Sequence, residues 1–286
     1  MITVKKMNFG YGKKRQLFSD LDMHLEGGNI YGLLGKNGAG KTTFLKIISG
    51  LRYPSNGVVN VLGVNPAERK PSFYNKLCFI PENLYVPPIS ASLYLSLYSP
   101  FYPDFNSKKF EKYSKDFELD LEAGKLNEMS HGQKKKFLLA FGMATQASVL
   151  ILDEPTNGLD IPSKSVFRRL VAGLADEKRV IIISTHQVRD VENLIDPIVV
   201  LENGKIIFNQ SVESLLSKVS FTHTKKLPEG INEIYHEKVM GGYMVCAEGS
   251  GLFNDTDLDF EFLFNTIVNN KEKIQKIFGG NSNGKK

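Results

Sequence analysis

Residues 35–42 read Gly-Lys-Asn-Gly-Ala-Gly-Lys-Thr and match the pattern G-x-x-x-x-G-K-[ST] in full. A short apolar run of strand character, residues 29–34, precedes this stretch, and residues 43–48 follow it with helical spacing. Strand, glycine-rich loop and helix form the order that a phosphate-binding loop requires. The alternative is a glycine-rich turn followed by a chance Lys-Thr pair, and the flanking pattern argues strongly against it.

The residue types of this loop predict how it binds phosphate. Its glycines let the backbone curl with the N–H groups pointing inward, and these groups form an anion site together with the helix N-terminus. We expect Lys41 to reach the β- and γ-phosphates of a nucleotide, and the Thr42 hydroxyl to hold Mg²⁺. The expected nucleotide contacts are Gly35, Asn37, Gly38, Ala39, Gly40, Lys41, Thr42 and Thr43.

A second acidic motif follows an apolar run at residues 149–154, which read Val-Leu-Ile-Leu-Asp-Glu. A buried strand that ends in a carboxylate is what a Mg²⁺ site opposite a phosphate loop requires. Asp153 is expected to bind the metal, and Glu154 to polarise an attacking water. A solvated turn is the simpler alternative, and it loses weight because a phosphate-binding loop lies upstream.

Composition excludes several classes of protein. The chain has 286 residues, of which 42% are hydrophobic and 23% charged, as is ordinary for a globular protein. The net charge of +5, from 36 basic and 31 acidic residues, is too weak to indicate a nucleic-acid partner. No apolar stretch approaches the roughly 20 residues that span a bilayer. Without a secretory signal either, we expect a cytoplasmic protein, or one held at a membrane by another protein.

The first half of the chain combines two kinds of sheet with helices. Strand patterns and turns fill residues 1–34, and residues 57–64 resemble them, which predicts an antiparallel sheet beside the loop. Residues 83–128 are rich in proline and aromatic side chains and then take helical spacing, which indicates a helical insert. Helix 132–146, strand 149–153, helix 163–175 and strand 179–184 are expected to follow. Strands that alternate with helices favour a parallel α/β core.

The composition changes near residue 215. Residues 216–256 have the character of short strands, and residues 257–278 that of one helix, so a small α+β appendage is expected. Residues 279–286 are expected to be a disordered tail. Cys78 and Cys246 have no metal-type spacing, and we expect two reduced thiols packed as small hydrophobic side chains.

Further motifs lie before and after the loop, in a fixed order. The set comprises Tyr11 in Phe9-Gly10-Tyr11-Gly12, the loop, Ser130-His131-Gly132-Gln133, Asp153-Glu154-Pro155-Thr156, Gly158-Leu159-Asp160, and His186 after Ile183-Ser184-Thr185. This set resembles the nucleotide-binding subunit of an ATP-binding cassette (ABC) transporter over about residues 1–215. The loop alone is shared with kinases and GTPases, whereas the Ser130 motif combined with the Asp-Glu-Pro-Thr run is far more specific.

The resemblance implies an α/β fold, with a P-loop NTPase core, an antiparallel β subdomain and a helical insert. The implied domains are an ABC ATPase domain at 1–215 with its insert at 83–128, and an accessory region at 216–278. It also implies ATP and Mg²⁺ as ligands and ATP hydrolysis as the activity. Glu154, His186 and Lys41 are the implied catalytic residues.

Several implied roles involve more than one chain. Tyr11 would stack on adenine, and His186 would be the switch histidine. In this family the signature motif of one subunit closes over ATP bound to another, so Ser130, Gly132 and Gln133 are expected to contact the partner's nucleotide. Asp160, in the D-loop, is assigned to the same composite site. The working unit is therefore expected to be a homodimer, or a heterodimer with another ABC ATPase subunit.

Three features near the motifs depart from the usual pattern or need a separate interpretation. Glu82 stands where the family usually has Gln, and it is expected to ligate Mg²⁺ while adding negative charge near the phosphates. His131 replaces a usual Gly, and it either donates a hydrogen bond to the nucleotide or points to solvent, which we favour. The lysines at 134–136 place positive charge near the start of a helix, where the helix dipole is already positive, and this is mildly unfavourable. We favour a solvated face for these lysines over a role in steering phosphate.

The resemblance implies a separate integral membrane subunit and a place on the inner face of the cell membrane, with export as the favoured direction. The aromatic residues between Tyr94 and Phe105 form either core of the insert or a docking surface. The alternative function is a non-transport ABC ATPase that acts on DNA or ribosomes. The span from Lys41 to Ser130 is too short for the coiled coil of DNA-repair types, and ribosome-binding types usually carry two cassettes.

Overall fold

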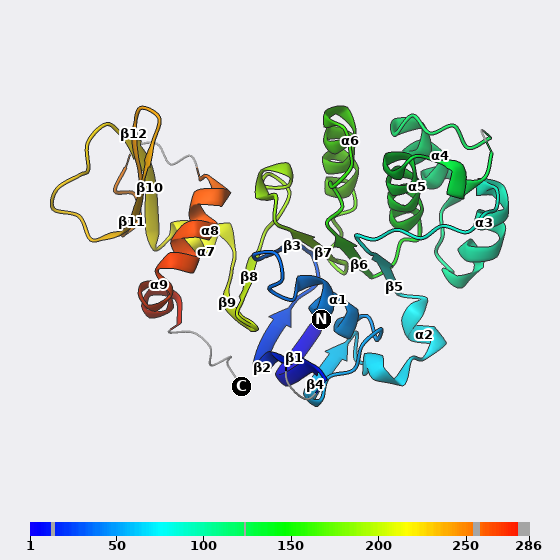
Figure 1. Ribbon diagram of the computed structural model, residues 1–286, viewed down its shortest axis with the longest axis horizontal. Helices are drawn as coiled ribbons and strands as arrows, with labels where there is room; N and C mark the ends of the chain where they lie inside the picture. The colour runs from blue at the N-terminus through cyan, green and yellow to red at the C-terminus, as the bar shows by residue number, and fades with distance from the viewer. Residues whose placement is uncertain (13–14, 123, 254–257, 280–286) are drawn as a thin grey trace.

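The computed structural model describes residues 1–12, 15–122, 124–253 and 258–279 (Figure 1). A six-stranded sheet lies between a three-stranded antiparallel sheet, a helical part and a C-terminal accessory region. The expected fold class, an α/β P-loop core with an antiparallel β subdomain, a helical insert and a small appendage, is confirmed. The expected disordered tail spans residues 279–286, of which 280–286 lie outside the described residues.

The central sheet has the strand order β5-β6-β7-β3-β8-β9. Its strands are β3 (Asn29–Leu34), β5 (Leu77–Ile80), β6 (Val149–Asp153), β7 (Val180–Thr185), β8 (Ile198–Glu202) and β9 (Lys205–Gln210). All neighbours run parallel except β8 and β9. β6 and β7 are buried along their whole length, as strands covered on both faces must be. Because parallel strands end at the same edge, the residues after β3, β5, β6 and β7 gather there.

The antiparallel sheet covers the loop helix on one side. Its strands β1 (Ile2–Tyr11), β2 (Arg15–Leu25) and β4 (Asn56–Val61) lie in the order β2-β1-β4. Helix α1 (Lys41–Ile48) begins directly after the glycine-rich loop. Phe44 of α1 is fully buried, and its ring meets Phe18 of β2 edge-to-face at 6.3 Å between centroids. One apolar core thus fixes the loop helix against both sheets.

Helices dominate the segment between β5 and β6. The helices of this segment are α3 (Ala91–Tyr98), α4 (Ser107–Asp116) and α5 (His131–Ala144), whereas α2 (Pro71–Tyr74) precedes β5 and α6 (Ile161–Ala172) follows β6. Short 3-10 helices lie at Pro66–Glu68, Ser99–Phe101, Leu126–Glu128 and Val188–Asp190. Phe137 of α5 has no exposed surface, and its ring lies 5.2 Å from Tyr94 and 5.8 Å from Phe110. Aromatic packing therefore joins α3, α4 and α5 into one unit.

The aromatic residues between Tyr94 and Phe105 are expected from the sequence to form either core of the insert or a docking surface. Some of them are buried and others are exposed. Tyr94 is 8% exposed and packs on Phe137 and Phe141. Phe101, in contrast, is 63% exposed, and Tyr98 is 38% exposed. Part of the stretch is core of the insert, and part leaves large apolar rings at the surface.

The accessory region is a small sheet covered by a helix. Its elements are α7 (Val212–Leu216), β10 (Val219–Thr224), β11 (Glu233–Val239), β12 (Gly242–Glu248), α8 (Phe260–Asn269) and α9 (Lys271–Phe278), with the sheet order β10-β12-β11. Phe262 of α8 packs on the rings of Phe221 and Tyr235. The prediction of one helix over 257–278 is wrong, because the chain leaves helical geometry at Asn270, where φ is −128°. The start of that prediction, residue 257, lies outside the described residues.

Both cysteines are buried and free, as expected. Burial raises the pKa of Cys78 to about 11 and that of Cys246 to about 12, so both stay protonated at neutral pH. Among the helices formed by the described residues, none is both long and apolar enough to cross a bilayer.

The aromatic cluster of the helical part predicts a stability effect. Phe137→Ala should lower the free energy of unfolding by about 3–5 kcal/mol, because it leaves a cavity where Tyr94, Phe110 and Phe137 meet. Urea denaturation followed by circular dichroism measures the change. Tyr85→Ala is the control, since Tyr85 is 80% exposed and should change stability little. Equal effects of both substitutions would contradict this account of the core.

Candidate active site

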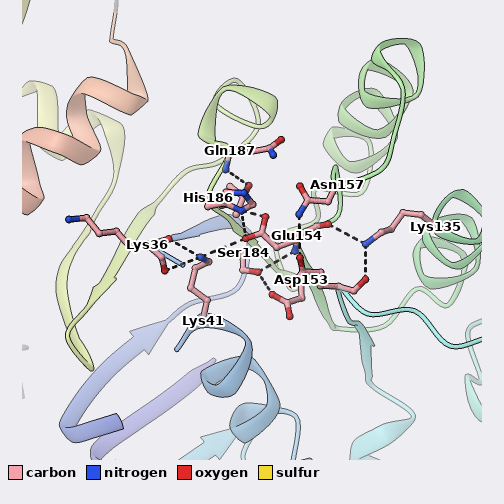
Figure 2. Close-up of polar contacts among 12 residues, drawn as sticks. Lys36, Lys41, Lys135, Asp153, Glu154, Asn157, Ser184, His186 and Gln187 are labelled. Atoms are coloured by element: carbon pink, nitrogen blue, oxygen red, sulfur yellow. Dashed lines mark hydrogen bonds and ion pairs between the residues drawn. The ribbon is translucent and has the colours of Figure 1, made fainter. Parts of the chain in front are cut away.

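The candidate site lies at the edge of the central sheet where four parallel strands end (Figure 2). The loop follows β3, Glu82 follows β5, Asp153 and Glu154 end β6, and His186 follows β7. In the register of the sheet, Asp153 lies opposite Ser184, so the two strand ends are level. The sheet therefore brings together residues that are more than a hundred positions apart in the sequence.

The loop glycines are required by geometry at two positions. Gly40 has a φ of 105°, in the region that only glycine enters readily, and a Cβ there would lie 2.9 Å from the Phe18 ring. A Cβ at Gly35 would lie 2.5 Å from the carbonyl oxygen of Leu201. No side chain caps the N-terminus of α1. The first N–H groups of α1 are therefore available to a phosphate.

Lys41 is buried beside the acidic residues. Its side chain is 7% exposed, and its Nζ donates to the carbonyl oxygen of Gly35 at 2.7 Å. The same ammonium lies 3.7 Å from Oε1 of Glu154. Burial lowers the pKa of Lys41, and the charges of Glu154 and Asp153 oppose that shift. A phosphate that enters the site would meet a desolvated ammonium, for which charge-assisted hydrogen bonds are strong.

Glu154 joins Lys41 to His186. Its side chain is 5% exposed, and its Oε1 lies 2.9 Å from Nδ1 of His186. The backbone N–H of His186 also approaches Oε2 of Glu154 at 3.4 Å. The carboxylate is held from two sides and faces the loop, which is the arrangement that a residue orienting a water molecule needs.

Asp153 offers an oxygen for a cation. It has no exposed surface, and its Oδ1 accepts a hydrogen bond from the hydroxyl of Ser184. Its Oδ2 is buried and has no hydrogen-bond partner among the described residues. The hydroxyl of Thr42 and the carboxylate of Glu82 line the adjacent cavity. These oxygen donors fit Mg²⁺, and the unpartnered oxygen of Asp153 is the observation that supports the fit.

The cavity over the loop has a volume of about 450 Å³, within the size range of ligand pockets. Its walls include Tyr11, Lys41, Thr43, Glu82, Glu154 and His186. The Tyr11 hydroxyl lies 2.7 Å from Oγ1 of Thr43, while the residue stays 46% exposed. The ring of Tyr11 therefore has room for a flat partner. A larger hollow of about 1200 Å³ borders the accessory region, but none of the expected phosphate contacts lines it.

The signature residues are not brought into this cavity. Ser130 and Gln133 form a reciprocal capping box at the start of α5, and both are exposed. Asp160 is exposed too; it caps α6 through the N–H of Ser163 at 2.9 Å, and these capping hydrogen bonds lower its pKa. Gly132 lies between Ser130 and Gln133 in the sequence. A Cβ on it would lie 3.0 Å from the carbonyl oxygen of Gly158. Within one chain, none of these residues therefore lines the cavity over the chain's own loop.

His131 and the three lysines after it take different positions. His131 is exposed, as favoured, and its ring packs at Gly158. The prediction of a solvated lysine face is wrong for Lys135, which is 0% exposed. Lys136 is also largely covered, with 16% of its side chain exposed and its Nζ 3.6 Å from Asp160. The helix turns Lys135 inward because it follows Gln133 by two positions, about 200° around the axis.

Sequence reasoning missed three contributors to the site. The prediction treats Lys135 as part of a solvated charged run, although the apolar Leu139 lies four positions later on the same helix face and could have indicated burial. Ser184 bonds Asp153, and Arg52 lies 5.8 Å from the centroid of the Tyr11 ring. Ser184 stands in the run before His186 but without an expected role, and Arg52 belongs to none of the motifs, so only the fold reveals their contacts.

Comparisons with known proteins agree with this geometry. A family model described as "ABC transporter" matches residues 18–157. NatA, an ABC transporter ATP-binding protein of Bacillus subtilis, is 28% identical over 85% of this chain and 99% of its own length. The bacitracin transport ATP-binding protein BcrA of Bacillus licheniformis is 32% identical over 76% of this chain and 68% of its own.

A similar fold occurs among solved structures. The dimeric ATP-binding cassette MJ0796, bound to ADP and phosphate, superposes with a TM-score of 0.66 over 74% of this chain and 99% of its own, at 21% identity. At that identity, the likeness supports the fold alone. The sequence match to BcrA, together with the family model, carries the assignment of family. The chain therefore belongs to the family of ABC transporter ATP-binding proteins.

Proposed function

We propose that this chain hydrolyses ATP to power transport through a separate integral membrane subunit. The observation that carries the proposal is the contact of Glu154 with both Lys41 and His186 beside the phosphate-binding loop. The relatives are named for ABC transport, and nothing favours the alternative of an ATPase acting on ribosomes or DNA.

In the proposed reaction, each residue acts on one part of ATP. The Tyr11 ring stacks on the adenine, the loop N–H groups bind the phosphates, and Lys41 faces the β- and γ-phosphates. Glu154 orients a water whose oxygen attacks the γ-phosphorus, and it receives a proton from that water. The bond from the γ-phosphorus to the bridging oxygen breaks, and ADP and phosphate leave. His186 holds the Glu154 carboxylate in the position from which it orients this water.

Mg²⁺ would be held by Asp153, Thr42 and Glu82, and when bound it neutralises charge on the β- and γ-phosphates. Asn157 supports this role of Glu82, because its amide donates to the Glu82 carboxylate at 3.4 Å. The ammonium of Lys135 also lies near Glu82, 3.5 Å from its carbonyl oxygen. The extra negative charge that Glu82 brings is therefore partly offset within the chain.

The active unit that we propose is a dimer with two composite sites. Ser130, Gly132 and Gln133 would contact the γ-phosphate bound by the partner, and Asp160 would border the same site. The exposed start of α5 supports this, since Ser130 and Gln133 are free to meet a partner and do not line the cavity over the chain's own loop. The partner in this dimer is either a second copy of this chain or another ABC ATPase subunit.

The membrane subunit would dock on the helical insert, with the chain at the inner face of the cell membrane. Phe101, Leu97 and Tyr85 are 63%, 52% and 80% exposed in this part of the chain, which supports contact with an apolar partner. Export is the direction we favour, because a further relative, SkfE of Bacillus subtilis, is named for peptide export and is 31% identical over 65% of this chain.

Removal of the buried ammonium tests nucleotide binding. Lys41→Ala should weaken ATP binding roughly 100-fold or more, because a charge-assisted contact in a desolvated site is lost. Isothermal titration calorimetry measures the affinity. Lys46→Ala, on the same helix but partly exposed, is the matched control and should bind ATP as the wild type does. Unchanged affinity in Lys41→Ala would refute the assignment of the phosphate-binding loop.

A second substitution separates binding from chemistry. Glu154→Gln should lower the rate of ATP hydrolysis by a factor of about 100 or more, because the amide cannot accept the proton. ATP should still bind, and an ATP-bound dimer should persist in size-exclusion chromatography. Glu177→Gln, at an exposed acid, is the control. If Glu154→Gln stays monomeric with ATP and Mg²⁺, the composite-site proposal needs the membrane subunit or is wrong.

The proposed docking surface is tested by a charge. Phe101→Glu should greatly reduce recovery of an integral membrane protein when the tagged chain is purified from detergent-solubilised membranes of its own cells, while ATP affinity stays unchanged. Met240→Glu, which also changes an exposed apolar side chain but lies in the turn between β11 and β12 of the accessory region, should retain full recovery. Wild-type chain that copurifies with ribosomes or nucleoid, without a membrane protein, would favour the non-transport alternative.

A further inference from the structure

Lys135 is a fully buried lysine that the proposed mechanism leaves without a catalytic role. It extends from α5 toward the end of β6, where its Nζ donates to the carbonyl oxygen of Glu154 at 3.2 Å (Figure 2). The same Nζ lies 3.5 Å from the carbonyl oxygen of Glu82. One ammonium therefore joins α5 to the residues that follow β5 and β6.

Glu154 has an unfavourable backbone conformation at this contact. Its φ is 47°, in the left-handed region that residues with a Cβ rarely adopt. Such a conformation persists only where the surroundings impose it. The N–H of Glu154 donates to the carbonyl oxygen of Ser184 at 3.0 Å, and its carbonyl oxygen accepts from Lys135. The same carbonyl oxygen also accepts from the N–H of Asn157 at 3.4 Å. Both peptide groups of Glu154 are thus held, one by β7 and the other by α5 together with the turn after β6.

The charges around Lys135 also favour a role at the site over a role in stability. Burial lowers its pKa, and the carboxylates of Glu82, Asp153 and Glu154 oppose that shift. A buried cation is costly, and replacing one with an apolar side chain of similar volume is often neutral or stabilising. Stability alone therefore gives little reason for a lysine at this position.

We propose that Lys135 is a positioning residue that fixes the backbone of Glu154, so that its carboxylate points at Lys41 and His186. The inference rests on the proposed role of Glu154 in hydrolysis. It adds a link between two parts of the chain, because Ser130 and Gly132 lie at the start of the helix that carries Lys135. When α5 moves as its start contacts the nucleotide bound by the partner, Lys135 transmits that movement to the Glu154 carboxylate of the same chain.

The test compares kcat and KM in the full-length chain. Lys135→Met keeps the length of the side chain but removes the ammonium, and kcat should fall by at least about 10-fold while KM for ATP stays within about two-fold. Lys135→Gln, which keeps a shorter donor, should lose less. Lys134→Met is the matched control on the same helix, where the side chain is partly exposed, and its kcat should match the wild type.

A double substitution decides whether Lys135 acts through Glu154. In a Glu154→Gln background, Lys135→Met should lower the residual kcat no further, because the carboxylate that it positions is already absent. An additional 10-fold loss there, an equal rise in KM, or an unfolded Lys135→Met protein would each overturn the proposal.

Two further results separate this inference from the proposed function. Unchanged kcat in Lys135→Met beside an inactive Glu154→Gln would overturn the positioning role alone. A wild-type chain without ATPase activity would overturn both the inference and the function on which it rests.

Discussion

The parallel register of β3, β5, β6 and β7 is the constraint on which the rest of the structure depends. It ends four strands at one edge, so the pairing of the strands brings the phosphate-binding loop, Glu82, Asp153, Glu154 and His186 together. The buried β-branched side chains of β6 and β7 hold this register, because a strand covered on both faces cannot shift without exposing them.

The edge that this register creates is a concentration of buried charge. Asp153 and Glu154 are almost fully covered, and Lys41 and Lys135 are the ammonium groups buried with them. Burial lowers the pKa of both lysines, and the carboxylates oppose that shift in each case. Lys41 contacts the carboxylate of Glu154, whereas Lys135 contacts its carbonyl oxygen. In the mechanism that we propose, one cation faces the ligand, and the other fixes the acid that acts on it.

The accessory region is joined to the same edge. Arg189, three residues after His186, lies 3.0 Å from Glu261 and 3.9 Å from Asp259 at the start of α8. At the other end of the region, Lys271 of α9 pairs with the buried Glu202 of β8. Phe278 packs its ring on Phe208 of β9 at 5.3 Å. These contacts make the accessory region continuous with the ATPase core in packing, although its sequence carries no motif.

The sequence alone determined the fold class, the loop and the acidic strand end, because each depends on local spacing that a short stretch specifies. Only the tertiary structure decided the burial of Lys135, the left-handed backbone of Glu154 and the break at Asn270 between α8 and α9. These features depend on which elements pack together, and a local pattern alone does not fix that. A lysine in a basic run is solvated by default, and here the packing of α5 against the strand ends places one in the interior.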